Sequence, residues 1–275
     1  MPAETTGALI DLRRGASSPS RRALFRLLQP VLNRILGLAE VNRVYAQLRS
    51  TRGQDGFFPT VLRVMDIDYQ ISPGDRMKIP SRGPVIVVAN HPFGAVDGLI
   101  LGDILSSVRQ DARILANELL MRIPEIRPWI IAVDAKADEG SSRANIGRMK
   151  AVVRWLRDGG LLGVFPSGTV SHLRIGGGVS DPAWHPNVAT LVRITGATVV
   201  PMFFDGQNSV LFQLAGLLHP SLRTLLLGAE AMKRKHSTVR VRIGQPLAKD
   251  LSARYSTDET LIQCLRAETY TLRQS

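Results

Sequence analysis

A histidine and an aspartate lie close together in the segment Val85–Leu101, which reads VIVVANHPFGAVDGLIL. An apolar run leads into Asn90 and His91, a Pro-Phe-Gly turn follows, and Asp97 stands at the start of an apolar helical pattern. A carboxylate one tight turn away can hold one imidazole nitrogen, which leaves the other free to act as a general base. Such a pair could activate a hydroxyl for acyl transfer. The alternative is that His91 caps the following helix and Asp97 satisfies its first turn.

Two further apolar runs end in polar loops. Leu161–Ser171 (LLGVFPSGTVS) ends in Pro-Ser-Gly-Thr, whose backbone N–H groups and hydroxyls can receive an anion, although an ordinary strand-terminating turn has the same composition. Val199–Ser209 (VVPMFFDGQNS) also runs into a polar loop. Ligands of open α/β sheets bind at the carboxyl ends of the strands. We therefore expect the three loops to contribute to one site.

Standard motifs for other chemistries are missing from the sequence. It contains no P-loop, no Gly-x-Gly-x-x-Gly after a strand, no His-Glu-x-x-His and no Gly-x-Ser-x-Gly elbow. These absences argue against nucleotide hydrolysis, dinucleotide redox chemistry and serine hydrolysis. The single cysteine, Cys264, excludes a disulfide framework and a cysteine-based zinc site, and we interpret it as a packing residue. No metal ligand is assigned to His185, His219 or His236, which lack neighbours at ligand spacing.

Strand-like and helical segments alternate from about residue 84 onward. The pattern predicts an α/β fold in one domain, with a largely parallel sheet flanked by helices. Strands are expected at Pro84–Ala89, Arg113–Ala116, Ile130–Val133, Leu161–Phe165, Thr198–Phe204 and Val239–Ile243. Helices are expected near Asp97–Ser107, Ser141–Arg157, Asn187–Ile194 and Thr257–Leu272.

The N-terminal part has a different pattern. Residues 1–20 are rich in Ser, Thr, Gly and Pro and are interpreted as a flexible tail, and residues 60–275 as the α/β domain. Residues 21–59 carry apolar side chains at helical spacing together with several arginines, and Pro30 would kink the helix. Such a basic amphipathic segment can lie at a membrane interface, or it can pack on the core with a solvated basic face. No stretch reaches the roughly 18 apolar residues that a membrane-spanning helix needs.

The positive net charge of the chain indicates which classes of molecule it could bind. The 275 residues include 35 Lys and Arg against 23 Asp and Glu, a net charge of +12 that favours nucleic acid, an anionic membrane or an acidic carrier. Aromatic residues are only 5% and no basic run is interleaved with them, which argues against a platform for nucleic acid. The Leu-rich segment Val210–Leu227, followed by Lys233, Arg234 and Lys235, is a second candidate for a membrane interface.

Taken together, these segments resemble the lysophospholipid (glycerolipid) acyltransferase superfamily, and within it the branch of hemolysin-like and lyso-ornithine lipid O-acyltransferases. The resemblance covers roughly residues 60–247, and its blocks are specific in combination although each alone is weak. The blocks are Asn90-His91-Pro92-Phe93-Gly94 with Asp97-Gly98, Arg122-Ile123-Pro124-Glu125, Phe165-Pro166-Ser167-Gly168-Thr169-Val170-Ser171, and Val200-Pro201. The motifs between Leu222 and Gly244 are also similar to that branch.

The resemblance implies a role for each residue. His91 would be the general base and Asp97 its orienting partner, while an acceptor hydroxyl attacks an acyl thioester carried by coenzyme A or acyl carrier protein. Backbone donors that the sequence does not identify would hold the oxyanion, with no metal, cofactor or covalent acyl-enzyme. The loop Phe165–Ser171 would bind the acceptor's polar head, and Pro201 would shape the donor pocket. The substrate-binding residues implied are Asn90, Phe93, Gly94, Ser167, Gly168, Thr169, Ser171 and Pro201.

The sequence departs from the superfamily pattern in two places, one in the His91–Asp97 pair and one in the acceptor loop. Five residues separate His91 from Asp97 where the most common signature has four, and the Pro-Phe-Gly turn is expected to absorb the extra residue. The usual Glu-Gly-Thr-Arg loop reads Ser167-Gly168-Thr169-Val170, so the carboxylate and the arginine suited to a glycerol phosphate are both absent. Lys136, Arg143 and Arg148 could supply a replacement cation or form a solvated helix face.

The resulting hypothesis is a peripheral O-acyltransferase on the cytoplasmic face of an anionic membrane. It would acylate the hydroxyl of a lysolipid, foremost a lyso-aminolipid such as lyso-ornithine lipid. One alternative is a 1-acylglycerol-3-phosphate or other lysophospholipid acyltransferase. An alternative of another class is a non-catalytic lipid-binding protein, which an intact His91–Asp97 pair argues against because lipid binding needs no general base. Nucleic acid is not expected as a partner.

Overall fold

A computed structural model describes residues 36–51, 56–133, 143–174, 176–248 and 250–274. The described chain forms two compact units. One consists of the described residues up to Ile67 together with Ser209–Ser237, and the other of the described residues between Asp68 and Asn208 together with those that follow Ser237. The predicted sheet belongs almost entirely to the second, larger unit.

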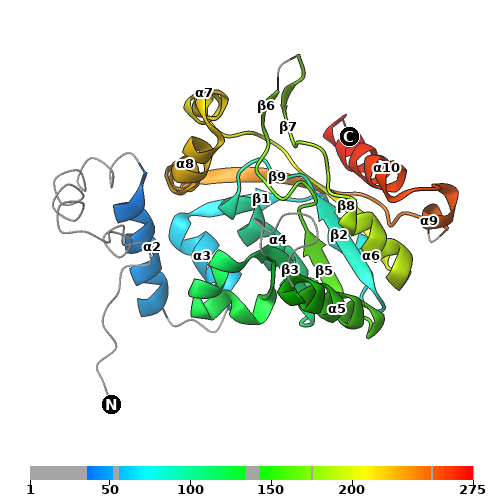
Figure 1. Ribbon diagram of the computed structural model, residues 1–275. Helices are drawn as coiled ribbons and strands as arrows, with labels where there is room; N and C mark the ends of the chain where they lie inside the picture. The colour runs from blue at the N-terminus through cyan, green and yellow to red at the C-terminus, as the bar shows by residue number, and fades with distance from the viewer. Residues whose placement is uncertain (1–35, 52–55, 134–142, 175, 249, 275) are drawn as a thin grey trace. The chain divides into compact units, whose positions relative to one another are not determined.

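The larger unit is built on a seven-stranded sheet of order β1-β9-β8-β2-β5-β3-β4 (Figure 1). The pairs β8–β2, β2–β5, β5–β3 and β3–β4 are parallel, while β9 runs antiparallel to β8. The strands are β1 Ile67–Gln70, β2 Val85–Ala89, β3 Ala112–Asn117, β4 Ile130–Val133, β5 Leu161–Val164, β8 Thr198–Phe204 and β9 Ser237–Ile243. The predicted fold class, a largely parallel sheet flanked by helices, is therefore confirmed.

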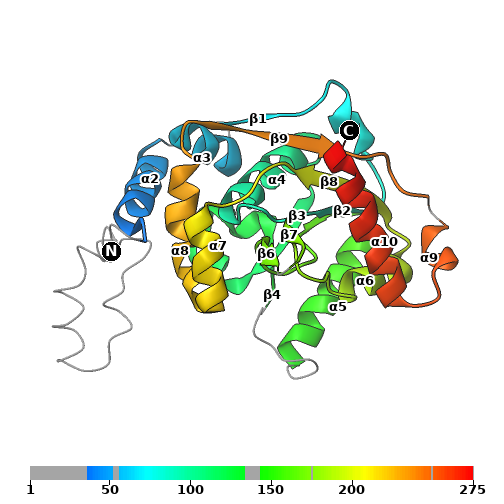
Figure 2. The ribbon, with the colours of Figure 1, turned by 90° about the horizontal axis from the view of Figure 1, so that it is seen from above.

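Helices cover both faces of this sheet (Figure 2). Alternate residues of the central strands, such as Ile86 and Leu162, pack against α5 (Arg143–Arg157), α6 (Asn187–Thr195) and α10 (Asp258–Thr271) in one apolar core. The opposite face packs against α4, Ala95–Val108. A side chain at Gly163 would meet Leu105 Cδ1 at 2.7 Å, so glycine lets α4 approach the sheet closely.

The larger unit also has shorter elements. A two-stranded antiparallel hairpin is formed by β6 (His172–Arg174) and β7 (Gly178–Ser180). The sequence patterns missed this hairpin and β1, because these strands have only three or four residues and contain polar side chains or glycine. The remaining short helices are η2 Asp75–Lys78, η3 Glu118–Arg122, η4 Pro124–Trp129, α9 Leu251–Arg254 and η5 Leu272–Gln274.

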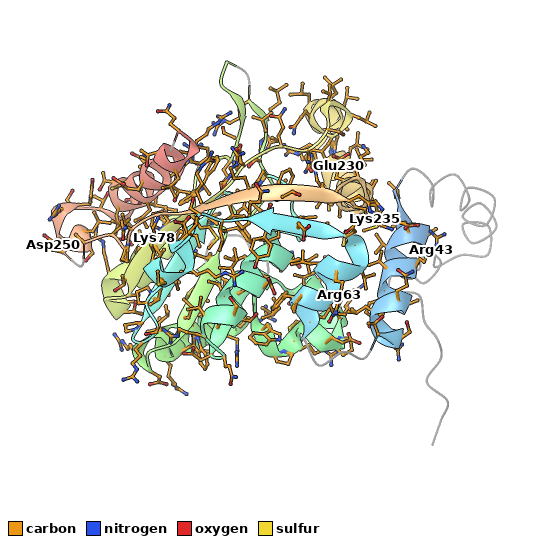
Figure 3. The ribbon with its side chains drawn as sticks, turned by 180° about the vertical axis from the view of Figure 1, so that it is seen from behind. Arg43, Arg63, Lys78, Glu230, Lys235 and Asp250 are labelled. Carbon is orange, nitrogen blue, oxygen red and sulfur yellow. The ribbon has the colours of Figure 1, made fainter. Side chains whose placement is uncertain are left out.

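The smaller unit is helical, with α2 (Leu38–Ser50), α3 (Phe57–Met65), α7 (Val210–Leu218) and α8 (Pro220–Lys233). Helix α2 packs on both α3 and α8, and α7 packs on α8. A Cβ at Gly37 would lie 2.9 Å from Ala229 Cα, so glycine permits the start of α2 to approach α8. Glu40 of α2 pairs with Arg43 and, at 2.9 Å, with Lys235 just after α8; both cations are labelled in Figure 3.

The predicted N-terminal segments lie largely outside the described residues. This applies to the flexible tail 1–20 and to residues 21–35 of the amphipathic segment. Helix α3 runs across the predicted boundary between residues 59 and 60, and the domain boundaries stay a prediction. Among the residues that the structure describes, no helix combines the length and the apolar character needed to cross a bilayer.

Candidate active site

The carboxyl end of β2 places His91 beside the end of β8. Asn90, the residue after β2, is buried, and its side chain pairs with the main chain of Phe204. The amide of Asn90 donates to the Phe204 carbonyl at 2.9 Å, and its oxygen accepts from the Phe204 N–H at 2.7 Å. This side chain thus continues the strand pairing for one more residue, which fixes the position of the histidine that follows.

Asp97 both orients His91 and begins α4. Its Oδ2 lies 3.0 Å from His91 Nδ1 and accepts hydrogen bonds from the N–H groups of Phe93 at 2.8 Å and Gly94 at 2.9 Å. Gly94 has φ of 85°, a conformation that glycine adopts without strain, and this closes the Pro-Phe-Gly turn. The turn therefore accommodates the five intervening residues. Asp97 thus satisfies the first turn of α4 and contacts His91 through the same oxygen, whereas the N-cap of α4 is Gly94 and not His91.

Burial dominates the electrostatics of Asp97. Its side chain is fully buried, and this burial raises the pKa of the carboxyl group, although the hydrogen bonds from His91, Phe93 and Gly94 act in the opposite direction. The second oxygen, Oδ1, is buried without a hydrogen-bond partner among the described residues. The contact with His91 is therefore a hydrogen bond of ordinary length whose carboxylate side is fully buried.

The imidazole of His91 is packed against an aromatic ring. It stacks on Phe165 with ring centroids 4.0 Å apart and an interplanar angle of 22°, and 17% of its side chain is exposed. Since Asp97 occupies Nδ1, Nε2 is the ring nitrogen that remains for a substrate proton. The stack on the face of the ring and the contact of Asp97 with Nδ1 at its edge together fix the orientation of the imidazole.

The loop after β5 is tied directly to the histidine main chain. Ser171 N–H donates to the His91 carbonyl at 2.8 Å, and the Ser167 hydroxyl donates to the Thr169 carbonyl at 2.7 Å. Gly168 has φ of 62° and forms the tip of the turn together with Thr169; both residues are exposed. The structure thus brings this loop and the His91–Asp97 pair together, as the sequence predicted.

The family follows from a comparison with known proteins. A family model described as Acyltransferase matches residues 22–275, nearly the whole chain. The chain belongs to this acyltransferase family. A solved structure of 1-acyl-sn-glycerophosphate (LPA) acyltransferase, PlsC, from Thermotoga maritima matches with a TM-score of 0.50. That match covers 92% of this chain and 97% of the other at 17% identity, so it supports the fold alone.

Two curated relatives of the acyltransferase carry the same name, lyso-glycine lipid O-acyltransferase. The protein from Phocaeicola vulgatus is 28% identical over 229 residues, which is 81% of this chain and 79% of the relative. The protein from Bacteroides thetaiotaomicron is 25% identical over 224 residues, covering 78% and 79% of the two chains. The aligned regions are thus most of each protein.

Several substrate-binding residues that the sequence suggested are buried in the acyltransferase. The side chains of Asn90, Phe93, Ser171 and Pro201 are buried, and that of Ser167 is 6% exposed. Pro201 pairs with Val88 inside the sheet. The ring of Phe93 fills the space where a Cβ of Gly206 would lie, at 2.4 Å. Gly168 and Thr169 remain the exposed members of the predicted set, and the substrate-binding roles of all these residues stay predictions.

Among the three candidate replacement cations, Arg148 is the one whose side chain the structure describes. Lys136 and the side chain of Arg143 lie outside the described residues. Arg148 pairs with Glu118 at 3.0 Å, which fits the solvated helix face that the sequence allowed. In the described part of the chain, no three His, Cys, Asp or Glu side chains come together as metal ligands.

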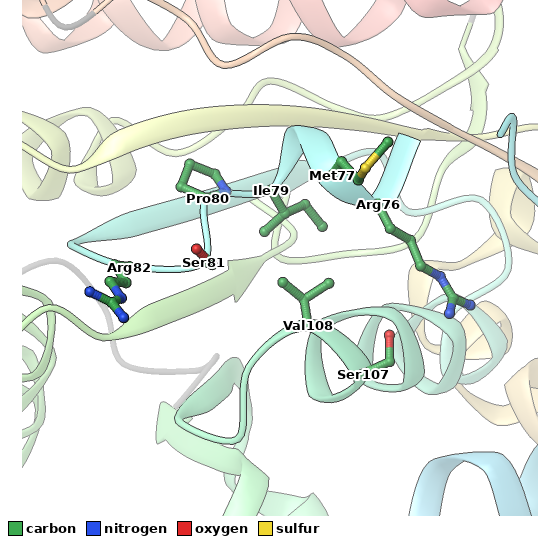
Figure 4. A pocket seen from close by; sticks show the side chains of 8 residues that line it. All are labelled: Arg76, Met77, Ile79, Pro80, Ser81, Arg82, Ser107 and Val108. Atoms are coloured by element: carbon green, nitrogen blue, oxygen red, sulfur yellow. The ribbon is translucent and has the colours of Figure 1, made fainter. Parts of the chain in front are cut away.

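A hollow of about 680 Å³ lies at the other end of the acyltransferase sheet (Figure 4). It is lined by Ser81 and Arg82, which precede β2, and by Ser107 and Val108 at the end of α4. His91 and Asp97 instead follow β2 and begin α4. No histidine or carboxylate is among its lining residues, so this hollow has no group suited to general-base catalysis.

Sequence reasoning missed two features that shape the site. Phe165 belongs to one of the blocks that carry the resemblance, but its stack on His91 could not be foreseen. Asp181 did not stand out in the sequence, yet it is fully buried and binds the N–H of His91 at 3.1 Å. The sequence offers only a weak indication of this role, namely that Asp181 precedes Pro182 and lies three residues before Trp184.

Proposed function

We propose that this acyltransferase moves a fatty acyl group from a thioester, acyl-CoA or acyl carrier protein, to the hydroxyl of a lysolipid. The acceptor class is a lyso-aminolipid, which includes lyso-ornithine lipid and lyso-glycine lipid. Two observations support this class: both curated relatives are named lyso-glycine lipid O-acyltransferases, and the Ser167–Val170 turn lacks the carboxylate and arginine suited to a glycerol phosphate.

The observation that carries the proposed chemistry is the contact of His91 Nδ1 with Asp97 Oδ2 at 3.0 Å. Nε2 of His91 takes the proton of the acceptor hydroxyl as its oxygen attacks the thioester carbonyl. The tetrahedral intermediate then collapses: the carbon–sulfur bond breaks, and the imidazolium returns the proton to the departing thiolate. Asp97 holds the ring orientation and stabilises the imidazolium, so neither a covalent acyl-enzyme nor a metal enters the sequence of steps.

Membrane association is proposed for the helical unit. Helices α7 and α8 expose large apolar side chains, with Val210, Leu211 and Leu218 exposed by 70%, 60% and 82%. Leu214, Leu217, Leu222 and Leu225 are also exposed. An apolar surface on a chain of net charge +12 is suited to the cytoplasmic face of an anionic bilayer, where a lysolipid acceptor is embedded.

The test is acyl transfer by purified protein from labelled acyl-CoA and acyl carrier protein. Acceptors are lyso-ornithine lipid, lyso-glycine lipid, lysophosphatidic acid and other lysophospholipids. We expect transfer to an aminolipid and a loss of about 10²- to 10⁴-fold in His91→Ala, the usual contribution of a general base. His185→Ala is the matched control, because it removes an imidazole that is exposed at the surface of the same unit.

Each outcome discriminates between the hypotheses. Native activity in a folded His91→Ala protein would overturn the mechanism. Transfer to lysophosphatidic acid alone would overturn the aminolipid acceptor while leaving the mechanism in place. Vesicle binding without transfer from either donor to any acceptor would favour a non-catalytic lipid-binding protein.

A further inference from the structure

Asp181 is a buried carboxylate outside the His91–Asp97 pair, and both of its oxygens are bound. Oδ1 accepts from the N–H of His91 at 3.1 Å and from the Ser171 hydroxyl. Oδ2 accepts from the indole Nε1–H of Trp184 at 2.9 Å. A carboxylate taken out of water is costly unless donors satisfy it, and these three donors do so for Asp181.

The main chain of Asp181 is anchored on the C-terminal helix α10. Its N–H donates to the hydroxyl oxygen of Tyr270 at 2.8 Å, and its carbonyl accepts from Arg266 Nη2 at 3.0 Å. The guanidinium of Arg266 lies 4.6 Å from the centroid of the Tyr270 ring, which fixes both side chains relative to each other. Burial and the nearby Asp181 charge raise the pKa of Tyr270 to about 12, so its hydroxyl stays protonated at neutral pH.

One oxygen atom of Asp181 therefore joins two segments that must be aligned. His91 ends the β2 segment and Ser171 ends the loop after β5; Ser171 also donates its N–H to the His91 carbonyl at 2.8 Å. Together these bonds hold the main chain of His91 on both sides, through its N–H and its carbonyl. Asp97 fixes the imidazole ring and Asp181 fixes the backbone that carries it.

We infer that Asp181 is a positioning residue that sets His91 and the loop Phe165–Ser171 in register through a single carboxylate oxygen. The inference rests on the proposed function, in which His91 takes a proton from an acceptor held by that loop. Errors of about 1 Å in such an alignment can cost about 100-fold in rate. A residue that sets this distance acts on kcat and leaves the binding of the acceptor largely unchanged.

The first variant is Asp181→Asn, which preserves the size of the side chain but has a single acceptor oxygen. It therefore cannot accept both from His91 and Ser171 on one side and from Trp184 on the other. The matched control is Asp258→Asn, which removes a carboxylate bound to Arg193 and Thr190 in the same unit. We expect kcat per folded molecule to fall about 10- to 100-fold in Asp181→Asn, with a near-native KM for the acceptor. The control is expected to retain kcat.

A second readout does not require turnover. In protein labelled with ¹⁵N-histidine, the Nδ1–H resonance of His91 is assigned by its loss in His91→Ala. We expect this resonance to broaden or shift in Asp181→Asn and to stay in place in Asp258→Asn. The readout separates failure of this inference from failure of the proposed function, because it holds even if no tested lipid is acylated.

Native kcat together with an unmoved His91 resonance in folded Asp181→Asn would overturn the inference, whatever the loss in melting temperature. If Asp181→Asn does not fold, Ser171→Ala and Trp184→Phe each remove one donor to the carboxylate. A lower kcat in both variants would support the positioning role, and native kcat in both would overturn it.

Discussion

At the scale of the residue, Asp97 shows how one carboxylate can serve two purposes. Its Oδ2 accepts three hydrogen bonds, from the His91 ring and from the N–H groups of Phe93 and Gly94. The amide bonds begin α4, and the imidazole contact orients the candidate base. Because the same oxygen makes all three hydrogen bonds, the first turn of α4 determines the orientation of the His91 ring.

The raised pKa of Asp97 predicts how its stability contribution varies with pH. Burial makes the carboxyl group of Asp97 bind a proton more readily in the folded state than in the unfolded chain. The contribution of Asp97 to the free energy of unfolding is therefore full below the unfolded pKa, and it is lost as the pH rises through the folded pKa. Asp97→Asn carries no titrating group. We therefore expect the unfolding free energy of the native protein, minus that of Asp97→Asn, to fall as the pH rises from about pH 4 upward, since pH 4 is near the unfolded pKa of an aspartate.

Urea denaturation of both proteins across this range measures that difference. Subtraction removes the titration of those shared groups that do not contact Asp97. A difference that grew with pH would show that the three hydrogen bonds to the ionised form outweigh burial, contrary to the prediction.

At the scale of the element, the α7–α8 pair depends on Glu230. Its buried carboxylate accepts from Lys233 at 2.6 Å and from the hydroxyl and the N–H of Ser209, which is the N-cap of α7. Burial alone would raise the pKa of Glu230, but the bonds from Lys233 and Ser209 outweigh it, and the pKa is lowered. The ionised side chain thus ties the start of α7 to α8.

Glu230→Gln should loosen this connection at neutral pH. Because the folded pKa is depressed, the contribution of Glu230 is present above its unfolded pKa and is lost as pH falls through the folded pKa. We expect hydrogen exchange in α7 to speed up at pH 7 by an amount that corresponds to about 2 kcal/mol of opening free energy, the usual value of hydrogen bonds to a charged group. Glu268→Gln, at an exposed position on α10, is the control. Equal exchange in α7 of both variants would contradict the prediction.

The elements also show what sequence patterns can and cannot reveal. Ile130–Val133 and Thr198–Phe204 were predicted with their observed bounds, because runs of β-branched and apolar residues favour strands. The contact of His91 with Asp97 spans only six residues and was within reach of local reasoning. Asp181 was not, since His91 lies 90 residues before it and Tyr270 lies 89 residues after it. Contacts between residues so far apart in the sequence depend on how the strands are arranged in the sheet, and the spacing of residue types along the chain does not predict that arrangement.

At the scale of the whole molecule, net charge and exposed apolar surface make a joint prediction for membrane binding. The chain carries +12, and α7 exposes 52% of Leu214 and 82% of Leu218. Transferring a leucine side chain from water to an apolar environment is worth about 1.5–3 kcal/mol. We therefore expect Leu214→Gln combined with Leu218→Gln to weaken binding to phosphatidylglycerol-containing vesicles by at least about tenfold.

Sedimentation with vesicles at increasing salt separates the two contributions. Salt screens the electrostatic part, because the Debye length falls to about 10 Å at 0.1 M, while the apolar part persists. Ile194→Gln, which alters a single exposed apolar side chain on α6, is the matched control. Vesicle binding that the leucine substitutions leave unchanged would assign the membrane contact to another surface.

The fluorescence of Trp184 can report on Asp181, a carboxylate that has no optical signal of its own. Its indole is 4% exposed and donates to Asp181, whereas Trp129 and Trp155, the other two tryptophans, are partly exposed. A chain with phenylalanine at those two positions emits from Trp184 alone. The fluorescence of such a chain reports the surroundings of Asp181 in real time, with no label attached and no substrate identified.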